Sequence, residues 1–231
     1  WPIVLKSARG GYDGKGVWVV NDSETARNVI ADIQNHGQEV LAEECVPFTR
    51  ELAAQVSRNA RGEFVSYPIV QSTQTDGICH EVIAPCPNLD EIRSEQAKEI
   101  AHRIATLLNV TGMLAVELFD TGSELLVNEL AMRPHNSGHW SMDGAVTSQF
   151  ENHLRAVLNL PLGASTPNQK WTVMVNLLGG KRQDPVAAFD YVMSEDAEIK
   201  IHFYGKAVKT GRKIGHVNLV GDNLDALLQR A

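Results

Sequence analysis

The sequence predicts an α+β protein in which antiparallel sheets carry flanking helices, with a small β-rich domain at the C-terminal end. Short apolar runs are separated by glycine-rich or polar turns, a pattern typical of antiparallel strands. Only a few longer stretches have helical spacing. The Leu160-Pro-Leu-Gly163 segment ends one of these helices, and small polar residues follow over 164–169. We therefore expect a domain boundary at residue 163.

The first 46 residues are predicted to form three short strands and one helix. Asp22 or Ser23 can cap the helix, because their side-chain oxygens accept hydrogen bonds from the free amides of a first helical turn. The strands are expected at 3–6, 16–20 and 38–45, and the helix at 24–35.

The central part, residues 47–163, is predicted to combine strands with two helices. Strands are expected at 50–57, 63–70, 112–119 and 125–131, a turn at 59–62, and helices at 90–109 and 145–159. The spacing of apolar residues predicts that the first of these helices buries a face made of Ile92, Ala97, Ile100, Ile104, Leu107 and Leu108. The last part, residues 164–231, is expected to contain strands at 171–178, 198–203, 206–208 and 214–220 and a helix at 222–230.

The composition argues against several classes of partner. A net charge of −7 gives no general attraction to nucleic acid or to an anionic membrane surface. No apolar run approaches the roughly 18 residues of a membrane span. The three cysteines form no CxxC pair, which favours a reduced, cytoplasmic protein. The start, Trp1-Pro-Ile-Val-Leu-Lys6, lacks Met and is typical of a strand interior, so we expect a fragment of a longer protein.

The most informative stretch is Asn128–Trp140, which holds Glu129, Arg133, His135 and Asn136 within a few positions. Each buried polar group must be hydrogen-bonded or hydrated, so a hydrophobic core does not favour so many polar groups in one stretch. The stretch follows an apolar strand and predicts a site that holds a metal and a small anion together. A polar surface loop after an edge strand is the alternative.

A second acid, Glu117, lies in the apolar run 113–119. A buried carboxylate is unfavourable unless it is paired or bound to a metal, and two of them on adjacent strands suit Mg²⁺. With a five-residue loop over 120–124, Glu117 and Glu129 share one face of the hairpin. A four-residue loop would separate them unless a bulge corrects the register.

Three further segments are candidates for binding phosphate or nucleoside. The stretch from Lys6 to Gly16 joins two strands and suits a flap over phosphates, although a simple glycine-rich hairpin is the alternative. Glu43 and Glu44 end a strand and could bind a ribose or adenine amine, or be merely solvated. Residues 199–220 contain five Lys or Arg and no acid, which suggests a phosphate-bearing substrate or a solvated basic hairpin.

Taken together, these motifs resemble the ATP-grasp superfamily. The closest resemblance is to the 5-(carboxyamino)imidazole ribonucleotide synthases, the ATPase subunits of phosphoribosylaminoimidazole carboxylase. The segments that carry it are Val4–Lys6, Gly11–Gly16, Glu43–Val46, Phe48–Glu51, Asn128-Glu129, Arg133–His139, Thr147–Glu151, Tyr204–Lys206 and Gly211–His216. The resemblance implies an ATP-grasp fold, with residues 1–46 as the B (lid) subdomain and 47–163 as the C subdomain with the Mg-ATP site. It also implies a homodimer at full length.

The implied reaction converts ATP, bicarbonate and 5-aminoimidazole ribonucleotide to the carbamate, ADP and phosphate by way of carboxyphosphate. Mg²⁺ is implied at Glu117 and Glu129. Bicarbonate is implied at Arg133, His135 and Asn136, and the ribonucleotide phosphate at Lys206 and Arg212. The implied ATP-binding residues are Lys6, Gly11, Tyr12, Asp13, Gly14, Lys15, Gly16, Glu43, Glu44, Cys45, Val46, Glu51, Gln74, Asn128 and Glu129.

Within the flap, Tyr12 and Lys15 are implied to contact the ribonucleotide as well, and Asp13 is a candidate acceptor of the amine proton. Some positions depart from the family pattern. Lys15 replaces a common Arg and loses bidentate contact, Gln74 replaces a common His, and Met132 replaces a common Pro. His80 is treated as structural or left unassigned.

The resemblance also implies an N-terminal α/β domain of roughly a hundred residues, which we expect to be missing from this fragment. We therefore expect impaired or absent synthase activity from the chain alone. The alternatives are another ATP-grasp carboxylate–amine ligase, a biotin-carboxylase-like protein, or an inactive fragment that keeps the ATP pocket.

Overall fold

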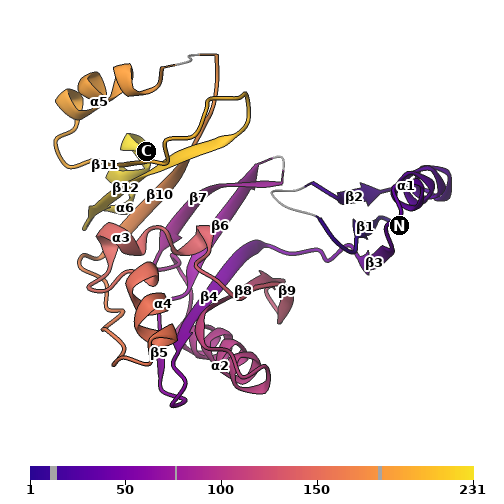
Figure 1. Ribbon diagram of the computed structural model, residues 1–231, viewed down its shortest axis with the longest axis horizontal. Coiled ribbons are helices and arrows are strands. Elements are labelled where there is room, and N and C mark those ends of the chain that lie inside the picture. Colours follow the sequence, from indigo (N-terminus) through magenta and orange to yellow (C-terminus); the bar gives the residue numbers. More distant parts are fainter. Residues whose placement is uncertain (11–14, 76, 182–183) are drawn as a thin grey trace.

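The computed structural model describes residues 1–10, 15–75, 77–181 and 184–231 of the chain, and within them it contains a three-stranded and a nine-stranded sheet. The small sheet and its helix form a unit that projects from the main body (Figure 1). The connector at residues 45–49 leads from this unit into the main sheet. The antiparallel α+β architecture predicted from the sequence is confirmed.

The N-terminal unit consists of β1 (Ile3–Ser7), β2 (Val17–Val20), α1 (Ser23–Asn35) and β3 (Val40–Glu44). The β1 strand lies in the middle and pairs antiparallel with both others. Asp22 caps α1, because its Oδ1 accepts hydrogen bonds from the amides of Glu24 and Thr25 at 2.9 and 2.8 Å. Leu5, Val20 and Ala26 form the small core between sheet and helix.

The main sheet has the strand order β11-β12-β10-β7-β6-β4-β8-β9, with β5 paired to β4, and every pair is antiparallel. Its strands are β4 (Arg50–Arg58), β5 (Phe64–Ser66), β6 (Val70–Thr75), β7 (Ile78–Ala84), β8 (Gly112–Asp120), β9 (Leu125–Ala131), β10 (Trp171–Leu178), β11 (Lys200–Phe203) and β12 (Lys213–Gly221). Because β10 pairs with β7, the C-terminal strands extend the main sheet. The division of the chain at residues 46 and 163 stays a prediction.

Three strand predictions needed correction. The expected strand at 63–70 is split, because the chain turns away from β4 after Tyr67, whose ring is buried and whose hydroxyl donates to the carbonyl of Thr147 at 2.9 Å. Neither β7 nor residues 71–75 of β6 were predicted as strand. Residues 206–208 form no strand, since they lie in the loop between β11 and β12.

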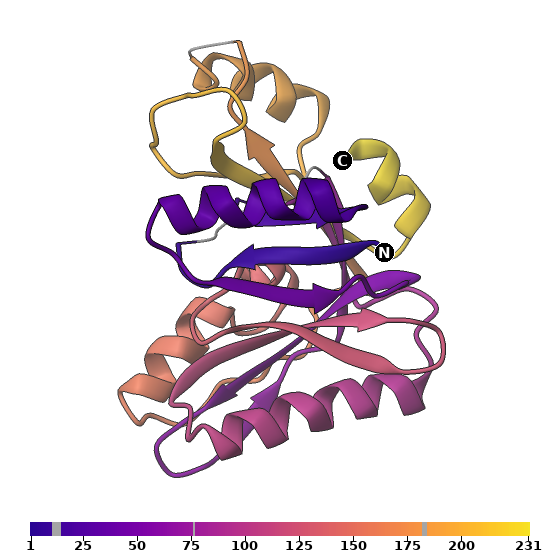
Figure 2. The ribbon, with the colours of Figure 1, turned by 90° about the vertical axis from the view of Figure 1, so that its right-hand side faces the viewer.

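Helices cover both faces of the main sheet. The α2 helix (Glu91–Leu107) runs along one face (Figure 2), and α3 (Ser141–Gly144) and α4 (Gln149–Val157) lie on the other. The α4 helix starts later than the expected residue 145, because the Ser148 side chain caps it by accepting from the amide of Glu151. The remaining helices are α5 (Phe189–Glu195) and α6 (Leu224–Arg230), with 3₁₀ turns η1 (Asn136–Gly138) and η2 (Val186–Ala188). None of the described helices combines the length and apolar character that crossing a membrane requires.

The predicted apolar face of α2 was partly wrong. Ile92 and Leu107 are 75% and 80% exposed, whereas Ala97, Ala101 and Ala105 are fully buried against β4 and β8. A row of alanines lets the helix approach the sheet closely, so the larger side chains fall at the edges of the contact. The stripe of small residues therefore determines the helix orientation, which a count of apolar residues could not reveal.

Replacing Ala101 with leucine is expected to lower the free energy of unfolding by about 1–3 kcal/mol, because the added side chain overpacks the contact with the sheet. Ala31→Leu is the matched control, since Ala31 is exposed on α1. Urea unfolding of both variants measures the difference. Equal stabilities would contradict the packing assigned to α2.

Candidate active site

The two acids predicted to share a metal lie opposite each other on the β8–β9 hairpin. Asp120 pairs with Leu125, so the connecting loop has the four residues 121–124 and the predicted five-residue loop is wrong. Regular pairing across such a loop would place Glu117 and Glu129 on opposite faces of the sheet.

A β-bulge at Asn128 restores the shared face. Leu118 pairs with Val127, but Glu117 pairs with Glu129, so Asn128 is the extra residue on β9. Because an inserted residue reverses the alternation of side chains, both carboxylates project from the face that also carries η1 and α4.

The surroundings of Glu117 favour its neutral form. Burial, with the charges of Glu129 and Glu51 as smaller contributions, raises the pKa of Glu117 to about 7. Burial also raises the pKa of Glu51, which lies opposite Phe119 and so on the same face as Glu117. A cation bound here would relieve the repulsion that these acids impose on one another.

Glu117 and Glu129 are suitable ligands for an Mg²⁺ ion that is also bound to the phosphates of a nucleotide. Across the described segments, no group of three or more His, Cys, Asp or Glu side chains has the geometry to hold a metal ion. Glu117 and Glu129 nevertheless supply the one or two carboxylates that Mg²⁺ takes from a protein when phosphate oxygens and water complete its shell.

His135 approaches this pair from the following loop. Its Nε2 lies 3.6 Å from Oε1 of Glu117. Burial, and then the charges of Arg133 and Lys213, lower the pKa of His135 to about 4, so the ring is neutral at neutral pH. Because the His135 ring is neutral, its contact with Glu117 is not an ion pair.

Buried amides fix the backbone and ring of His135. Oε1 of Gln149 accepts from the amide of His135 at 2.9 Å, and Nε2 of Gln149 donates to its carbonyl at 2.8 Å. Oγ of Ser137 lies 2.9 Å from Nδ1 of His135 and accepts from Nε2 of Gln55 at 3.3 Å. Gln149, Ser137 and Gln55 are buried, so water does not compete for these hydrogen bonds.

Lys6 links the N-terminal unit to this site. Its ammonium lies 2.7 Å from Oε2 of Glu43 and 3.5 Å from Oδ1 of Asn128 on the bulge. Glu44 follows Glu43 and therefore projects from the opposite face of β3. Cys45 and Val46 begin the connector to β4. The bulge thus brings Asn128 toward the lysine predicted to bind ATP phosphates.

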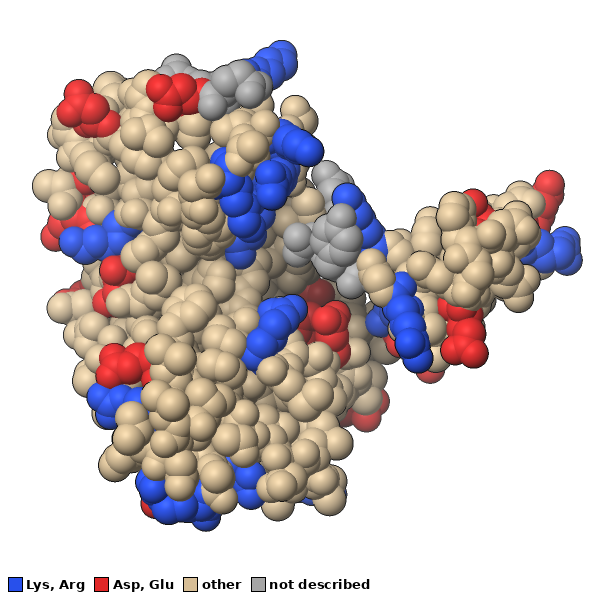
Figure 3. All heavy atoms as spheres, in the orientation of Figure 1, with Lys and Arg blue, Asp and Glu red and all other residues tan. Residues whose placement is uncertain are grey.

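The basic segment contacts the loop that holds His135. Lys213 donates a hydrogen bond from Nζ to Oδ1 of Asn136. Nζ of Lys206 lies 5.1 Å from the centre of the Tyr204 ring, and Arg212 donates to the carbonyl of Ala207. Lysine and arginine side chains gather where the body faces the N-terminal unit, next to acidic side chains (Figure 3).

For the other predicted site residues, the structure shows fewer contacts with the Glu117–Glu129 pair and its surroundings. Arg133 is exposed and donates to the carbonyl of Pro134. Gln74 lies beside an irregularity in the β6–β7 pairing. The carbonyl of Gly16 accepts from the amide of Ser7 at 2.9 Å, and Lys15 precedes it in the flap. Gly11, Tyr12, Asp13 and Gly14 lie outside the described residues.

Four residues of this site were not given individual roles from the sequence, namely Lys213, Gln149, Ser137 and Gln55. Lys213 lies in the Gly211–His216 motif and Gln149 in the Thr147–Glu151 motif, yet neither was given a role. The motifs marked their positions, but only the tertiary structure reveals their contacts with Asn136 and His135.

The fold and site define a class of protein. The ATP-grasp domain family matches residues 1–150, so the chain belongs to the ATP-grasp family. The phosphoribosylaminoimidazole carboxylase C-terminal domain family matches residues 172–230.

Comparisons with individual proteins show more specific similarities within this family. The chain is 48% identical to the N5-carboxyaminoimidazole ribonucleotide synthase of Mycobacterium tuberculosis, over all of this chain and 54% of that protein. It is also similar to the crystal structure of the Thermus thermophilus synthetase, with 41% identity and a TM-score of 0.86 over 99% of this chain and 59% of that one. The Aspergillus clavatus synthase complex with ADP and 5-aminoimidazole ribonucleotide has 31% identity and a TM-score of 0.88, over 100% and 60%. The chain spans about half the length of the curated relatives it matches.

Proposed function

We propose that this protein carboxylates 5-aminoimidazole ribonucleotide with bicarbonate and ATP, giving N5-carboxyaminoimidazole ribonucleotide, ADP and phosphate in purine biosynthesis. One observation carries the proposal. The bulged hairpin sets Glu117 opposite Glu129, and His135 lies 3.6 Å from Glu117. A site for a phosphoryl donor thus adjoins a loop suited to a small anionic acceptor. The relatives named for this reaction align with the whole chain.

In the donor half, Glu117 and Glu129 would hold Mg²⁺, which when bound neutralises charge on the phosphates. Lys6, Asn128 and the flap residues Gly11, Gly14 and Gly16 would bind the ATP phosphates. Glu43, Glu44, Cys45, Val46, Glu51 and Gln74 would contact the nucleoside. The Aspergillus clavatus relative, crystallised with ADP, supports a nucleotide site in this fold.

In the acceptor half, Arg133, His135 and Asn136 would bind bicarbonate. An oxygen of bicarbonate attacks the γ-phosphorus of ATP, so that carboxyphosphate forms and ADP leaves. Arg133 would neutralise the charge of the new anion, and the neutral His135 ring can donate a hydrogen bond to it. The Gln149 amide, which hydrogen-bonds to the backbone of His135 on both sides, holds the ring in place during the step.

The ribonucleotide amine then attacks the carboxyl carbon, or CO₂ released from carboxyphosphate. A C–N bond forms, phosphate leaves, and Asp13 would accept the amine proton. Lys206 and Arg212 would bind the ribonucleotide phosphate, with Tyr12 and Lys15 closing over the substrate. We further propose that the full-length protein is a cytoplasmic homodimer.

The alternative is a protein that keeps the ATP pocket and binds ATP without turnover. The test is ADP release by the protein at full natural length, given ATP, Mg²⁺ and bicarbonate. We expect release to rise when 5-aminoimidazole ribonucleotide is added. ATPase activity that ignores the ribonucleotide would overturn the synthase proposal, and ATP binding without turnover would favour the alternative.

A further inference from the structure

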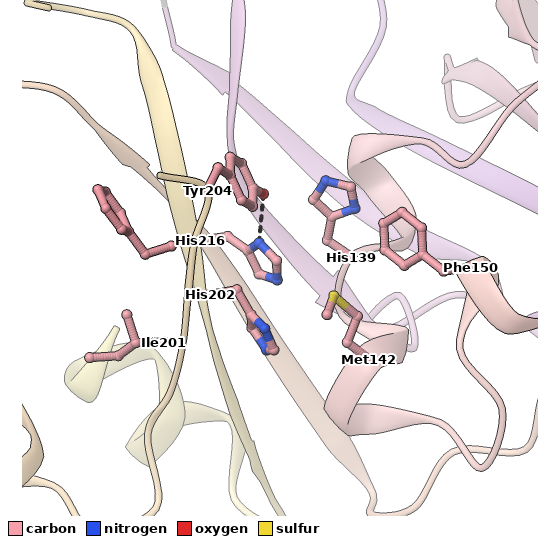
Figure 4. A pocket seen from close by; sticks show the side chains of 8 residues that line it. His139, Met142, Phe150, Ile201, His202, Tyr204 and His216 are labelled. Atoms are coloured by element: carbon pink, nitrogen blue, oxygen red, sulfur yellow. Dashed lines mark hydrogen bonds between the residues drawn. The ribbon is translucent and has the colours of Figure 1, made fainter. Parts of the chain in front are cut away.

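An array of aromatic side chains connects the C-terminal strands to the catalytic loop. His202 on β11 and His216 on β12 lie directly opposite each other, and their rings stack with centres 4.5 Å apart and planes 17° apart. Two residues further along, the Tyr204 hydroxyl lies 2.7 Å from Nδ1 of His216 (Figure 4). Burial raises the pKa of Tyr204 to about 12 and lowers that of His216 to about 3. The tyrosine therefore stays protonated and donates to a neutral imidazole.

The far end of the array is anchored on α3. Nε2 of His202 and Nδ2 of Asn218 each lie 2.7 Å from Oδ2 of Asp143. Although burial opposes ionisation, these two hydrogen bonds lower the pKa of Asp143. An ionised carboxylate accepts both hydrogen bonds, so His202 carries its proton on Nε2 and its ring orientation is fixed.

The rings of the array have open space on one side. They border a cavity of about 470 Å³, which His139, Met142 and Phe150 close from the opposite side (Figure 4). A side chain with open space beside it can change rotamer unless a directional contact prevents it. The hydrogen bond to His216 is such a contact for Tyr204.

Two lysines converge on the face of the Tyr204 ring. Nζ of Lys206 and Nζ of Lys213 lie 5.1 and 5.8 Å from its centre, within the range of cation–π attraction. Lys213 also donates to Oδ1 of Asn136, in the loop proposed to bind bicarbonate. Residues 199–220 contain no acid, so an anionic ligand would relieve the repulsion between the two ammonium groups.

We propose that Tyr204 is a positioning residue: its ring, held in place by His216, sets the separation of Lys206 and Lys213 so that both bind the phosphate of the substrate. Lys213 thereby links the phosphate-binding segment to Asn136. The inference rests on the proposed function for the identity of the phosphate-bearing substrate. Its test measures binding and requires no turnover, so it can fail independently of the synthase proposal.

The test is the affinity of the protein for ribose 5-phosphate at low salt, measured by NMR titration, with unphosphorylated ribose as the control ligand. Tyr204→Phe keeps the ring and removes the hydroxyl. We expect about three- to tenfold weaker binding, the effect of losing one hydrogen bond. Tyr191→Phe is the matched control, since Tyr191 on α5 is 67% exposed, and it should bind as the wild type does.

A second variant tests whether Tyr204 acts through the lysine. In a Lys213→Met background, Tyr204→Phe should weaken binding by less than twofold, because the two changes affect one interaction. Equal effects in both backgrounds would overturn the positioning role. So would unchanged affinity in Tyr204→Phe, or a wild-type protein that does not distinguish ribose 5-phosphate from ribose.

Discussion

Glu117→Gln is expected to lower Mg²⁺-dependent turnover by on the order of 10²–10³-fold, as when one electrostatic contact to developing charge is removed. The substitution keeps the shape of the side chain and removes its negative charge. Steady-state ADP release over a range of Mg²⁺ concentrations measures the loss. Glu124→Gln, in the exposed loop of the same hairpin, is the control and should leave turnover unchanged. A Glu117→Gln rate within threefold of wild type would remove Glu117 from the metal site.

The same variant should make the metal-free protein more stable at high pH. Burial and neighbouring acids raise the pKa of Glu117 from 4.5 to about 7, so the folded state holds this proton more tightly than the unfolded chain. The stability linked to this proton is complete below pH 4.5 and is lost as the pH rises through 7. At pH 8 without metal, Glu117→Gln should raise the free energy of unfolding by up to about 3 kcal/mol. Urea unfolding at pH 4.5 and pH 8 measures this, and a loss of stability at pH 8 would contradict it.

Gly138→Ala is expected to damage both the fold and the site. A Cβ at Gly138 would lie 2.3 Å from Oε1 of Gln149 and 2.4 Å from Nε2 of Gln55, closer than real contacts allow. Both side chains are buried and hold the loop of His135, so neither can move without losing hydrogen bonds. We expect a loss of about 1–3 kcal/mol in the free energy of unfolding, together with reduced ADP release.

Gly180→Ala is the matched control for this experiment. A Cβ there would meet nothing within 4 Å, so the change in stability should stay within roughly 0.5 kcal/mol. If Gly138→Ala matched Gly180→Ala in urea unfolding, the tight packing of the two glutamines around this loop would be wrong.

The hairpin of β8 and β9 illustrates what the sequence could predict about the site. The strands, the turn and the need for Glu117 and Glu129 to share a face followed from apolar spacing and the cost of a buried charge. The route to that shared face did not, because the loop is one residue shorter than expected and the bulge at Asn128 compensates. A bulge depends on pairing across the sheet, which local pattern does not encode.

Contacts between distant segments were also beyond the sequence. Gln149 hydrogen-bonds to the backbone of His135, which lies 14 positions earlier in the chain. Lys213 hydrogen-bonds to the side chain of Asn136, which lies 77 positions earlier. The alanine face of α2 was missed because burial depended on how closely the helix approaches the sheet. Motifs marked where chemistry-bearing residues gather, and the tertiary fold decided which of them touch.

The central claim is that a phosphoryl donor site and a bicarbonate site meet between Glu117 and His135. The most direct test supplies ¹⁸O-labelled bicarbonate to the protein at full natural length, with Mg²⁺, ATP and 5-aminoimidazole ribonucleotide. ³¹P NMR then reads the isotope content of the released phosphate. Because carboxyphosphate passes a bicarbonate oxygen to phosphorus, we predict that each phosphate released carries one ¹⁸O. Phosphate that takes its new oxygen only from water would contradict the account.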